Sequence, residues 1–221
     1  MPLRNLYVLI AAAIGVVGLA FNFVEIAGVM GPPQNRSFLN FLVYFVSFLT
    51  NLSNIALLLT YLSDHSDWGW LGWFRRHVTR GGLAGIMILV MFFYHFMLAP
   101  TLPKDLPQTI TVSNILLHYL TPLLYLGWWA LWVPHGGLRW SHVPEMLLPG
   151  LLYTAYAEVR GIIASEYPYE ILDPTVKLPD GSMTGYGMVF VSVGVLVLLV
   201  AAFDAALVIA DGLLGKARAN A

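Results

Sequence analysis

The sequence predicts an all-α, polytopic membrane protein, in which six transmembrane helices pack in one bundle. Hydrophobic residues make up 58% of the 221 residues, whereas charged residues make up only 10%. The mean hydropathy of +0.74 lies well above that of an ordinary soluble domain. The apolar residues also gather in six runs, most of them close to the roughly 20 residues that a helix needs to cross a bilayer.

The six expected spans are residues 6–28, 38–62, 80–98, 111–133, 143–164 and 186–211. Pro and Gly residues separate them, as in Gly31-Pro32-Pro33 and in the segment from Pro100 to Pro107. The first run resembles a signal peptide, but it continues for about twenty residues without a convincing small-residue cleavage site, so we expect it to be retained. No repeat or linker is visible, and residues 1–221 are expected to form a single domain.

The basic residues predict the orientation of the bundle. With the N-terminus in the cytoplasm, seven basic residues face the cytoplasm and three face outward, which agrees with the positive-inside rule. The seven are Arg4, Arg75, Arg76, Arg80, Arg139, Lys216 and Arg218, and the three are Arg36, Lys104 and Lys177. We therefore expect a multi-pass protein of the inner (plasma) membrane with both termini in the cytoplasm.

The longest outer segment runs from Glu166 to Gly185. It is long enough to fold over the outer mouth of a bundle, and a lid is one use of such a loop. A solvated connector is the other interpretation.

The composition excludes several classes of function. The chain has no Cys, which excludes disulfides and thiolate chemistry. Its net charge is −1 and it has no basic cluster beyond Arg75-Arg76-His77, so nucleic acid is not an expected partner. Gly-x-Ser-x-Gly, His-Glu-x-x-His and Walker motifs are absent from the sequence. No metal, cofactor or obligate protein partner is expected.

The second span carries an unusual density of polar residues. Ser47, Asn51 and Asn54 follow i, i+4, i+7 spacing, and Thr50 and Ser53 flank that stripe. Bilayer hydrocarbon offers no water to these groups, so they must find partners inside the bundle. Small polar residues commonly join membrane helices, which is one interpretation. A nucleophilic Thr50 is the other.

Further polar residues on other spans are candidate site residues. In the fourth span, Asn114, His118, Thr121 and Tyr125 share one face, and an ionisable residue within a membrane span is a functional hypothesis by default. The candidates for contact with substrate on the third and fifth spans are Tyr94, His95, Tyr153, Tyr156 and Arg160. Arg160 can instead pair with Glu158 or Asp173, or extend to the interface.

Thr50 and His118 are chemically suited to act as a nucleophile and a base. A Thr hydroxyl is a weak nucleophile and needs a base within hydrogen-bond reach. Expected span boundaries place Thr50 about 18 Å and His118 about 10 Å below the outer helix starts, and the difference shrinks if the fourth helix begins near Pro107. Asp204 and Glu158 are both candidates to orient the imidazole.

Acyl transfer also needs hydrogen-bond donors for the oxyanion. An intact transmembrane helix has already used its backbone N–H groups, so side chains are the expected donors. The candidates are Asn51, Asn54, Asn114 and a Tyr hydroxyl.

Three segments of the chain resemble the androgen-induced protein family, and more closely its bacterial six-helix branch. They are Phe48-Leu49-Thr50-Asn51-Leu52-Ser53-Asn54, then Asn114-Ile115-Leu116-Leu117-His118-Tyr119 followed by Pro122, and last Tyr156 to Arg160-Gly161 leading to Tyr167-Pro168-Tyr169 and Leu172-Asp173. The similarity covers essentially all six spans. The family's animal members are intramembrane threonine hydrolases that cleave fatty acid esters of hydroxy fatty acids. The resemblance implies that Thr50 is the nucleophile and His118 its base.

The sequence thus favours an integral membrane lipid-ester hydrolase, with a lipid ester as substrate and membrane lipids as surroundings. Two alternatives remain open. One is a non-enzymatic lipid-binding, transport or receptor protein that uses the same polar cavity. The other is a haem protein with His95 and His118 as axial ligands.

Overall fold

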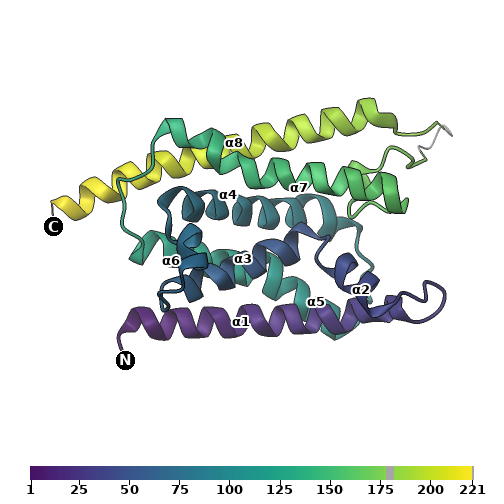
Figure 1. The fold of residues 1–221 in the computed structure, drawn as a ribbon, viewed down its shortest axis with the longest axis horizontal. Helices are drawn as coiled ribbons and strands as arrows, with labels where there is room; N and C mark the ends of the chain where they lie inside the picture. The colour runs from purple at the N-terminus through teal and green to yellow at the C-terminus, as the bar shows by residue number, and fades with distance from the viewer. Residues whose placement is uncertain (178–181, 221) are drawn as a thin grey trace.

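The structure, a computed structural model, describes residues 1–177 and 182–220; residues 178–181, in the segment between α7 and α8, and residue 221 are not described. The described residues form helices and turns, with one isolated antiparallel bridge between Lys177 and Met183 and no strand (Figure 1). The prediction of an all-α fold is confirmed.

Eight α-helices make up most of the described chain. They are α1 (Leu3–Ile26), α2 (Phe38–Phe45), α3 (Leu49–Ser63), α4 (His77–Phe93), α5 (Gln108–Ile115), α6 (Thr121–Trp132), α7 (Val143–Ala164) and α8 (Gly185–Ala219). Two π-turns, Tyr94–Leu98 and Leu116–Leu120, extend α4 and connect α5 to α6. Short 3₁₀ turns are Ala27–Met30, Gly69–Arg75, Ala99–Thr101, Trp140–His142 and Glu170–Leu172.

Four continuous helical segments among the described residues are long and apolar enough to cross a membrane: Leu3–Met30, His77–Thr101, Gln108–Trp132 and Gly185–Ala219. The pair α2 and α3 makes a fifth span if its two parts are taken together. The fifth expected span, 143–164, does form helix α7. Its Glu145, Glu158 and Arg160 lower its hydropathy, so its passage through a membrane remains a prediction.

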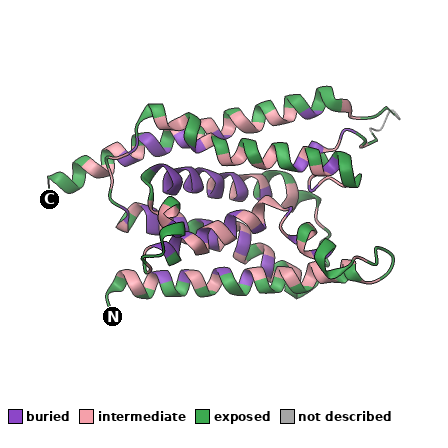
Figure 2. Ribbon diagram, in the orientation of Figure 1, coloured by how far each residue is buried: buried purple, intermediate pink, exposed green. Residues whose placement is uncertain are grey.

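Helix α4 lies in the middle of the bundle. It packs against α3, α6, α7 and α8, while α1 contacts α3, α5 and α6 on the other side (Figure 1). Buried residues concentrate on α4 and its neighbours, whereas the outer sides of α1 and α8 are exposed along much of their length (Figure 2). Exposed Leu9, Val24, Phe190 and Leu198 are typical of surfaces that face lipid.

Small residues let the neighbouring elements approach α4 closely. A Cβ at Gly82 would lie 3.2 Å from the backbone of Met146 in α7, and one at Gly81 would lie 2.9 Å from the Leu138 side chain. At Gly85 a Cβ would overlap the carboxyl of Asp204 in α8. Glycine in α4 therefore sets the spacing of the bundle centre, as small residues commonly do between membrane helices.

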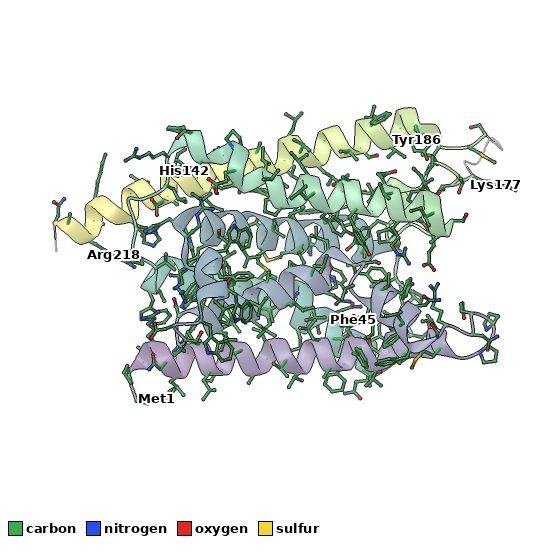
Figure 3. All side chains as sticks on the ribbon, viewed as in Figure 1. Met1, Phe45, His142, Lys177, Tyr186 and Arg218 are labelled. Carbon is green, nitrogen blue, oxygen red and sulfur yellow. The ribbon has the colours of Figure 1, made fainter. Side chains whose placement is uncertain are left out.

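Both termini lie at the same end of the bundle, together with His142 and Arg218, whereas Lys177 and Tyr186 lie at the opposite end (Figures 1 and 3). This arrangement brings together many of the basic residues that predicted the cytoplasmic side. Which end faces the cytoplasm remains a prediction.

At the end that holds the termini, Asp64 pairs with two cations. Its carboxyl lies 2.5 Å from the Arg4 guanidinium and also binds Arg80. The Arg80 side chain is 9% exposed and stacks over the Trp128 ring at 5.2 Å. A buried guanidinium without its counter-charge costs several kcal/mol.

We therefore predict that Asp64→Asn destabilises the protein by about 3 kcal/mol, because Arg80 loses its buried counter-charge. Thermal unfolding in detergent micelles measures this loss. Asp67→Asn changes an exposed carboxylate three residues away and serves as the control. Equal melting temperatures for the two variants would show that the Asp64 cluster does not contribute as described.

Candidate active site

The second span is broken at residues 46–48, where a continuous helix 38–62 was predicted. Helix α2 ends at Phe45, α3 begins at Leu49, and their axes differ by 81°. Figure 3 shows Phe45 in the half of the molecule nearer Lys177 and Tyr186. The expectation of one uninterrupted helix was wrong, because polar side chains satisfy the backbone groups that the break exposes.

Two of these side chains come from the stripe on the second span itself. The Asn51 side-chain amide donates to the Phe45 carbonyl at 2.8 Å, across the break. The Ser47 hydroxyl donates to the Val43 carbonyl at 2.6 Å. Ser and Asn side chains offer backbone groups such local alternatives to helical bonds.

Helix α7 supplies two tyrosines to the same break. Tyr153 donates to the Ser47 carbonyl at 2.9 Å, and the Tyr156 hydroxyl lies 2.9 Å from the Ser47 hydroxyl. Both tyrosines were predicted to contact substrate. The structure places their hydroxyls on the backbone turn that carries Thr50, and Tyr153 also lines the adjacent cavity.

The break puts Thr50 in the first turn of α3, where its hydroxyl oxygen lies 3.2 Å from Nε2 of His118. Helix α5 begins at Gln108, directly after Pro107, which removes much of the expected difference in depth. Thr50 and His118, predicted as a pair from the sequence, therefore lie within hydrogen-bond distance in the structure.

The tautomer of His118 follows from its second hydrogen bond. Its Nδ1 lies 3.1 Å from the Asn114 backbone carbonyl, and a carbonyl oxygen can only accept. Nδ1 thus carries the hydrogen, and Nε2 is the nitrogen that accepts from Thr50. The orienting group is the Asn114 carbonyl, whereas Asp204, one of the two candidates from the sequence, packs beside Gly85.

The imidazole of His118 is further held by stacking and by the local helix geometry. Its ring lies parallel to that of Tyr94, with centroids 4.1 Å apart and an interplanar angle of 18°. Each of these two residues sits in a π-turn. Such turns are rare within helices and frequently occur at functional sites.

Asn54 connects the turn that carries Thr50 to the turn that carries His118. Its side-chain amide donates to the Thr50 carbonyl at 2.8 Å and to the Leu117 carbonyl at 3.3 Å. Its oxygen accepts from the Thr121 hydroxyl at 2.5 Å. Asn54 is fully buried, and it ties the first turn of α3 to the π-turn that carries His118.

This geometry bears on the predicted oxyanion donors. The amide N–H groups of Asn51 and Asn54 are directed at backbone carbonyls, so in this arrangement their hydrogen bonds are structural. Asn114 contributes its backbone carbonyl to His118. An oxyanion role for any of these side chains requires the exchange of an existing hydrogen bond or a rearrangement.

An apolar cavity of about 90 Å³ opens beside Thr50 and His118. Helices α4, α7 and α8 form most of its wall, with Tyr94 and Tyr153 among the lining side chains. The segment 169–172 after α7 lines it as well, through Tyr169, Ile171 and Leu172. This volume admits only part of a long acyl chain, so the remainder would extend between helices or into lipid.

Two further residues that were predicted to contact substrate, His95 and Arg160, have partners other than Thr50 and His118. His95 is exposed, and its Nδ1 lies 3.0 Å from the Tyr119 hydroxyl. In this structure Nε2 of His118 lies against the Thr50 hydroxyl, so haem ligation by His118 would require the exchange of that contact. In the described residues, no three His, Cys, Asp or Glu side chains gather closely enough to hold a metal ion.

Arg160, the last predicted contact residue, belongs to a cluster near the C-terminal end of α7. Arg160 and Arg36 both bind the carboxylate of Glu166, and Arg36 stacks on the Tyr44 ring at 4.5 Å. Burial raises the pKa of Glu166, but hydrogen bonds from the two guanidinium groups outweigh burial and hold that pKa below its usual range. The cluster fixes the start of the segment that reaches the cavity.

Comparison of the chain with models of protein families, with curated proteins and with solved structures finds no match. The resemblance to the androgen-induced protein family therefore rests on the three sequence segments that carry it.

Sequence reasoning missed three features of this site. The break in the second span has no Gly or Pro to mark it, although the polar run from Ser47 to Asn54 was a signal that backbone groups could be satisfied locally. Tyr169 and Glu166 were not singled out, because contacts between a loop and a distant helix have no periodic signal in the sequence.

We predict that Asn54→Leu destabilises the protein by about 3 kcal/mol, because buried groups on α3 and on the Leu116–Leu120 turn lose their partners. Thermal unfolding in detergent measures the change. Asn40→Leu, on the exposed surface of α2, is the matched control. A melting temperature equal to that of the control would contradict the joining role of Asn54.

The cluster around Glu166 predicts a dependence on pH. A lowered pKa in the folded state stabilises the fold above the ordinary Glu pKa, and this contribution is lost as the pH falls through the lowered value. We expect Glu166→Gln to melt below wild type at pH 5–7, and the difference to shrink once the pH falls below about 4 and to vanish below the lowered pKa of Glu166. Glu170→Gln, an exposed residue of the same segment, should match wild type throughout. A difference that persists unchanged at pH 3 would contradict this origin.

Proposed function

We propose that the protein is an intramembrane lipid-ester hydrolase with Thr50 as nucleophile and His118 as base. The observation that supports this most strongly is the 3.2 Å contact between the Thr50 hydroxyl and the unprotonated nitrogen of His118, at the edge of an apolar cavity. A hydroxyl needs such a base to become nucleophilic. The apolar wall suits an acyl chain.

In the first half of the proposed reaction, the Thr50 oxygen attacks the ester carbonyl carbon and its proton passes to Nε2 of His118. The π electrons of the carbonyl move to its oxygen and form an oxyanion. When this intermediate collapses, the bond to the alcohol oxygen breaks and the leaving alkoxide takes the proton from His118. The products are an alcohol and an acyl group on Thr50.

In the second half, His118 accepts a proton from water, which attacks the acyl carbon. The second intermediate collapses and breaks the bond to Thr50, and the Thr50 oxygen recovers its proton from His118. Free fatty acid leaves. The Asn114 carbonyl stabilises the imidazolium in both halves, because it accepts from Nδ1–H.

The substrate class follows from the surroundings and from the resemblance. The cavity is small and mostly apolar, so a long-chain ester would enter sideways from lipid and leave part of its chain between helices. The resemblance favours fatty acid esters of hydroxy fatty acids or related lipid esters. We place the protein in the inner membrane, with six spans and both termini in the cytoplasm.

One observation favours a second candidate, a lipid-binding or transport protein. The second span is broken by 81° within the bundle, and discontinuous helices commonly form the binding sites of secondary transporters. Such a protein would bind lipid in the same cavity without cleaving it. Covalent labelling of Thr50 distinguishes the two.

We expect an alkyl fluorophosphonate to label purified wild type at Thr50, because its phosphorus accepts the activated hydroxyl oxygen and fluoride leaves. Thr50→Ala should abolish this adduct, and His118→Gln should slow its formation by about 10²-fold through loss of the base. Intact-protein and peptide mass spectrometry measure both.

Thr60→Val is the matched control, since Thr60 lies on the same helix but its hydroxyl donates to the Ala56 carbonyl. It should label like wild type. Wild type that binds lipid but forms no adduct at Thr50, and hydrolyses no 4-nitrophenyl ester, would favour the binding or transport candidate.

A further inference from the structure

Tyr169, in the segment after α7, has its hydroxyl directed at the Thr50 turn. Its ring lies between Phe48 and Phe93, with centroids 6.1 and 5.8 Å away, and it lines the same cavity as Thr50 and His118. Its hydroxyl is directed at the Thr50 turn, where it interacts electrostatically with the Thr50 side chain, with the backbone N–H groups of Thr50 and Leu49, and with the Tyr153 hydroxyl. Tyr169 thus lies beside the nucleophile in the wall of the cavity.

The backbone of this turn has N–H groups to offer because the second span is broken. A helix leaves its first N–H groups without intrahelical acceptors. In α3, the N–H groups of Asn51 and Leu52 both donate to the Phe48 carbonyl, and Phe48 provides no side-chain cap. The N–H groups of Leu49 and Thr50 therefore face partners outside the helix, which are the Tyr169 hydroxyl and, for Leu49, the Tyr153 hydroxyl as well, and an oxyanion would take the place of these hydroxyl oxygens.

The direction of the Tyr169 hydrogen bond follows from the dyad. The proton of Thr50 points at His118, so the Thr50 oxygen can only accept from Tyr169. When Thr50 attacks a carbonyl carbon, negative charge develops on an oxygen one bond further away. The Tyr169 O–H is directed at the same turn, and in the proposed reaction it turns from the Thr50 oxygen to donate to that oxygen.

We propose that Tyr169, together with the backbone N–H groups of Leu49 and Thr50, binds the oxyanion of the reaction. This proposal rests on the hydrolase function proposed above and names the donors that function requires. Donors of this kind act where charge develops, and removal of one commonly costs 10²–10³-fold in kcat.

The fold holds Tyr169 in place from both sides. Glu166 is clamped by Arg36 and Arg160 three residues before it, and Leu172 is buried three residues after it. The Tyr167 ring occupies the space that a Cβ on Gly161 would fill. This gives the third sequence segment, from Tyr156 to Asp173, a chemical role: it delivers Tyr169 to the nucleophile.

The test compares Tyr169→Phe with wild type in the hydrolysis of 4-nitrophenyl butyrate by the full-length protein in detergent. Phe keeps the ring contacts and removes only the hydroxyl. We expect kcat to fall about 10²-fold with KM little changed, and the protein to stay folded with a small decrease in melting temperature, because the first-turn N–H groups lose a hydroxyl partner. Tyr167→Phe, which loses a hydroxyl from the same segment away from Thr50, should keep wild-type kcat.

Three results would overturn the proposal. An equal or higher kcat for Tyr169→Phe would show that its hydroxyl does not stabilise the oxyanion. An equal fall in kcat for Tyr167→Phe, or a loss of activity in Tyr169→Phe that is due to a raised KM with kcat unchanged, would assign the effect to loop structure. A wild type that neither hydrolyses the ester nor forms a fluorophosphonate adduct at Thr50 would overturn the hydrolase function, and the role of Tyr169 with it.

Discussion

The break between α2 and α3 is the constraint on which the rest of this structure depends. A continuous second span would hold Thr50 in mid-helix, with its backbone N–H groups already used. The 81° bend instead turns Thr50 into a first-turn residue beside His118. The protein supports this bend with side chains from two helices, since Asn51, Ser47, Tyr153 and Tyr156 all bind groups at or next to it.

The polar residues within the bundle consequently divide into two kinds. Asn51, Asn54 and Tyr153 satisfy backbone carbonyls and so make the bend and its contact with α5 and α6 possible. Thr50, His118 and Tyr169 meet at the edge of the cavity and are the groups that could act on a ligand. The first kind keeps the second in place, which is why so many polar groups are needed around one Thr.

The fold class and the general positions of the helices could be predicted from the sequence, because hydropathy and the Pro and Gly segments report them directly. The pairing of Thr50 with His118 could be predicted because a Thr nucleophile needs a base, and because the family resemblance implies both residues. The bend was not, because no helix-breaking residue marks it and the tyrosines that stabilise it come from α7, about 100 residues later. Tyr169 was missed for a related reason. Its role depends on N–H groups that only the bend exposes, and the assumption of an intact helix excluded them.

The chain has no Cys, so Thr50→Cys introduces a single thiol at the position of the proposed nucleophile. Its rate of reaction with N-ethylmaleimide at pH 7 can be compared with that of the double variant Thr50→Cys/His118→Gln. If the bend places residue 50 within reach of the imidazole, we expect the single variant to react about tenfold faster, because only the single variant keeps the base that takes the proton of the thiol. Equal rates in the two variants, or no reaction in either, would contradict that placement.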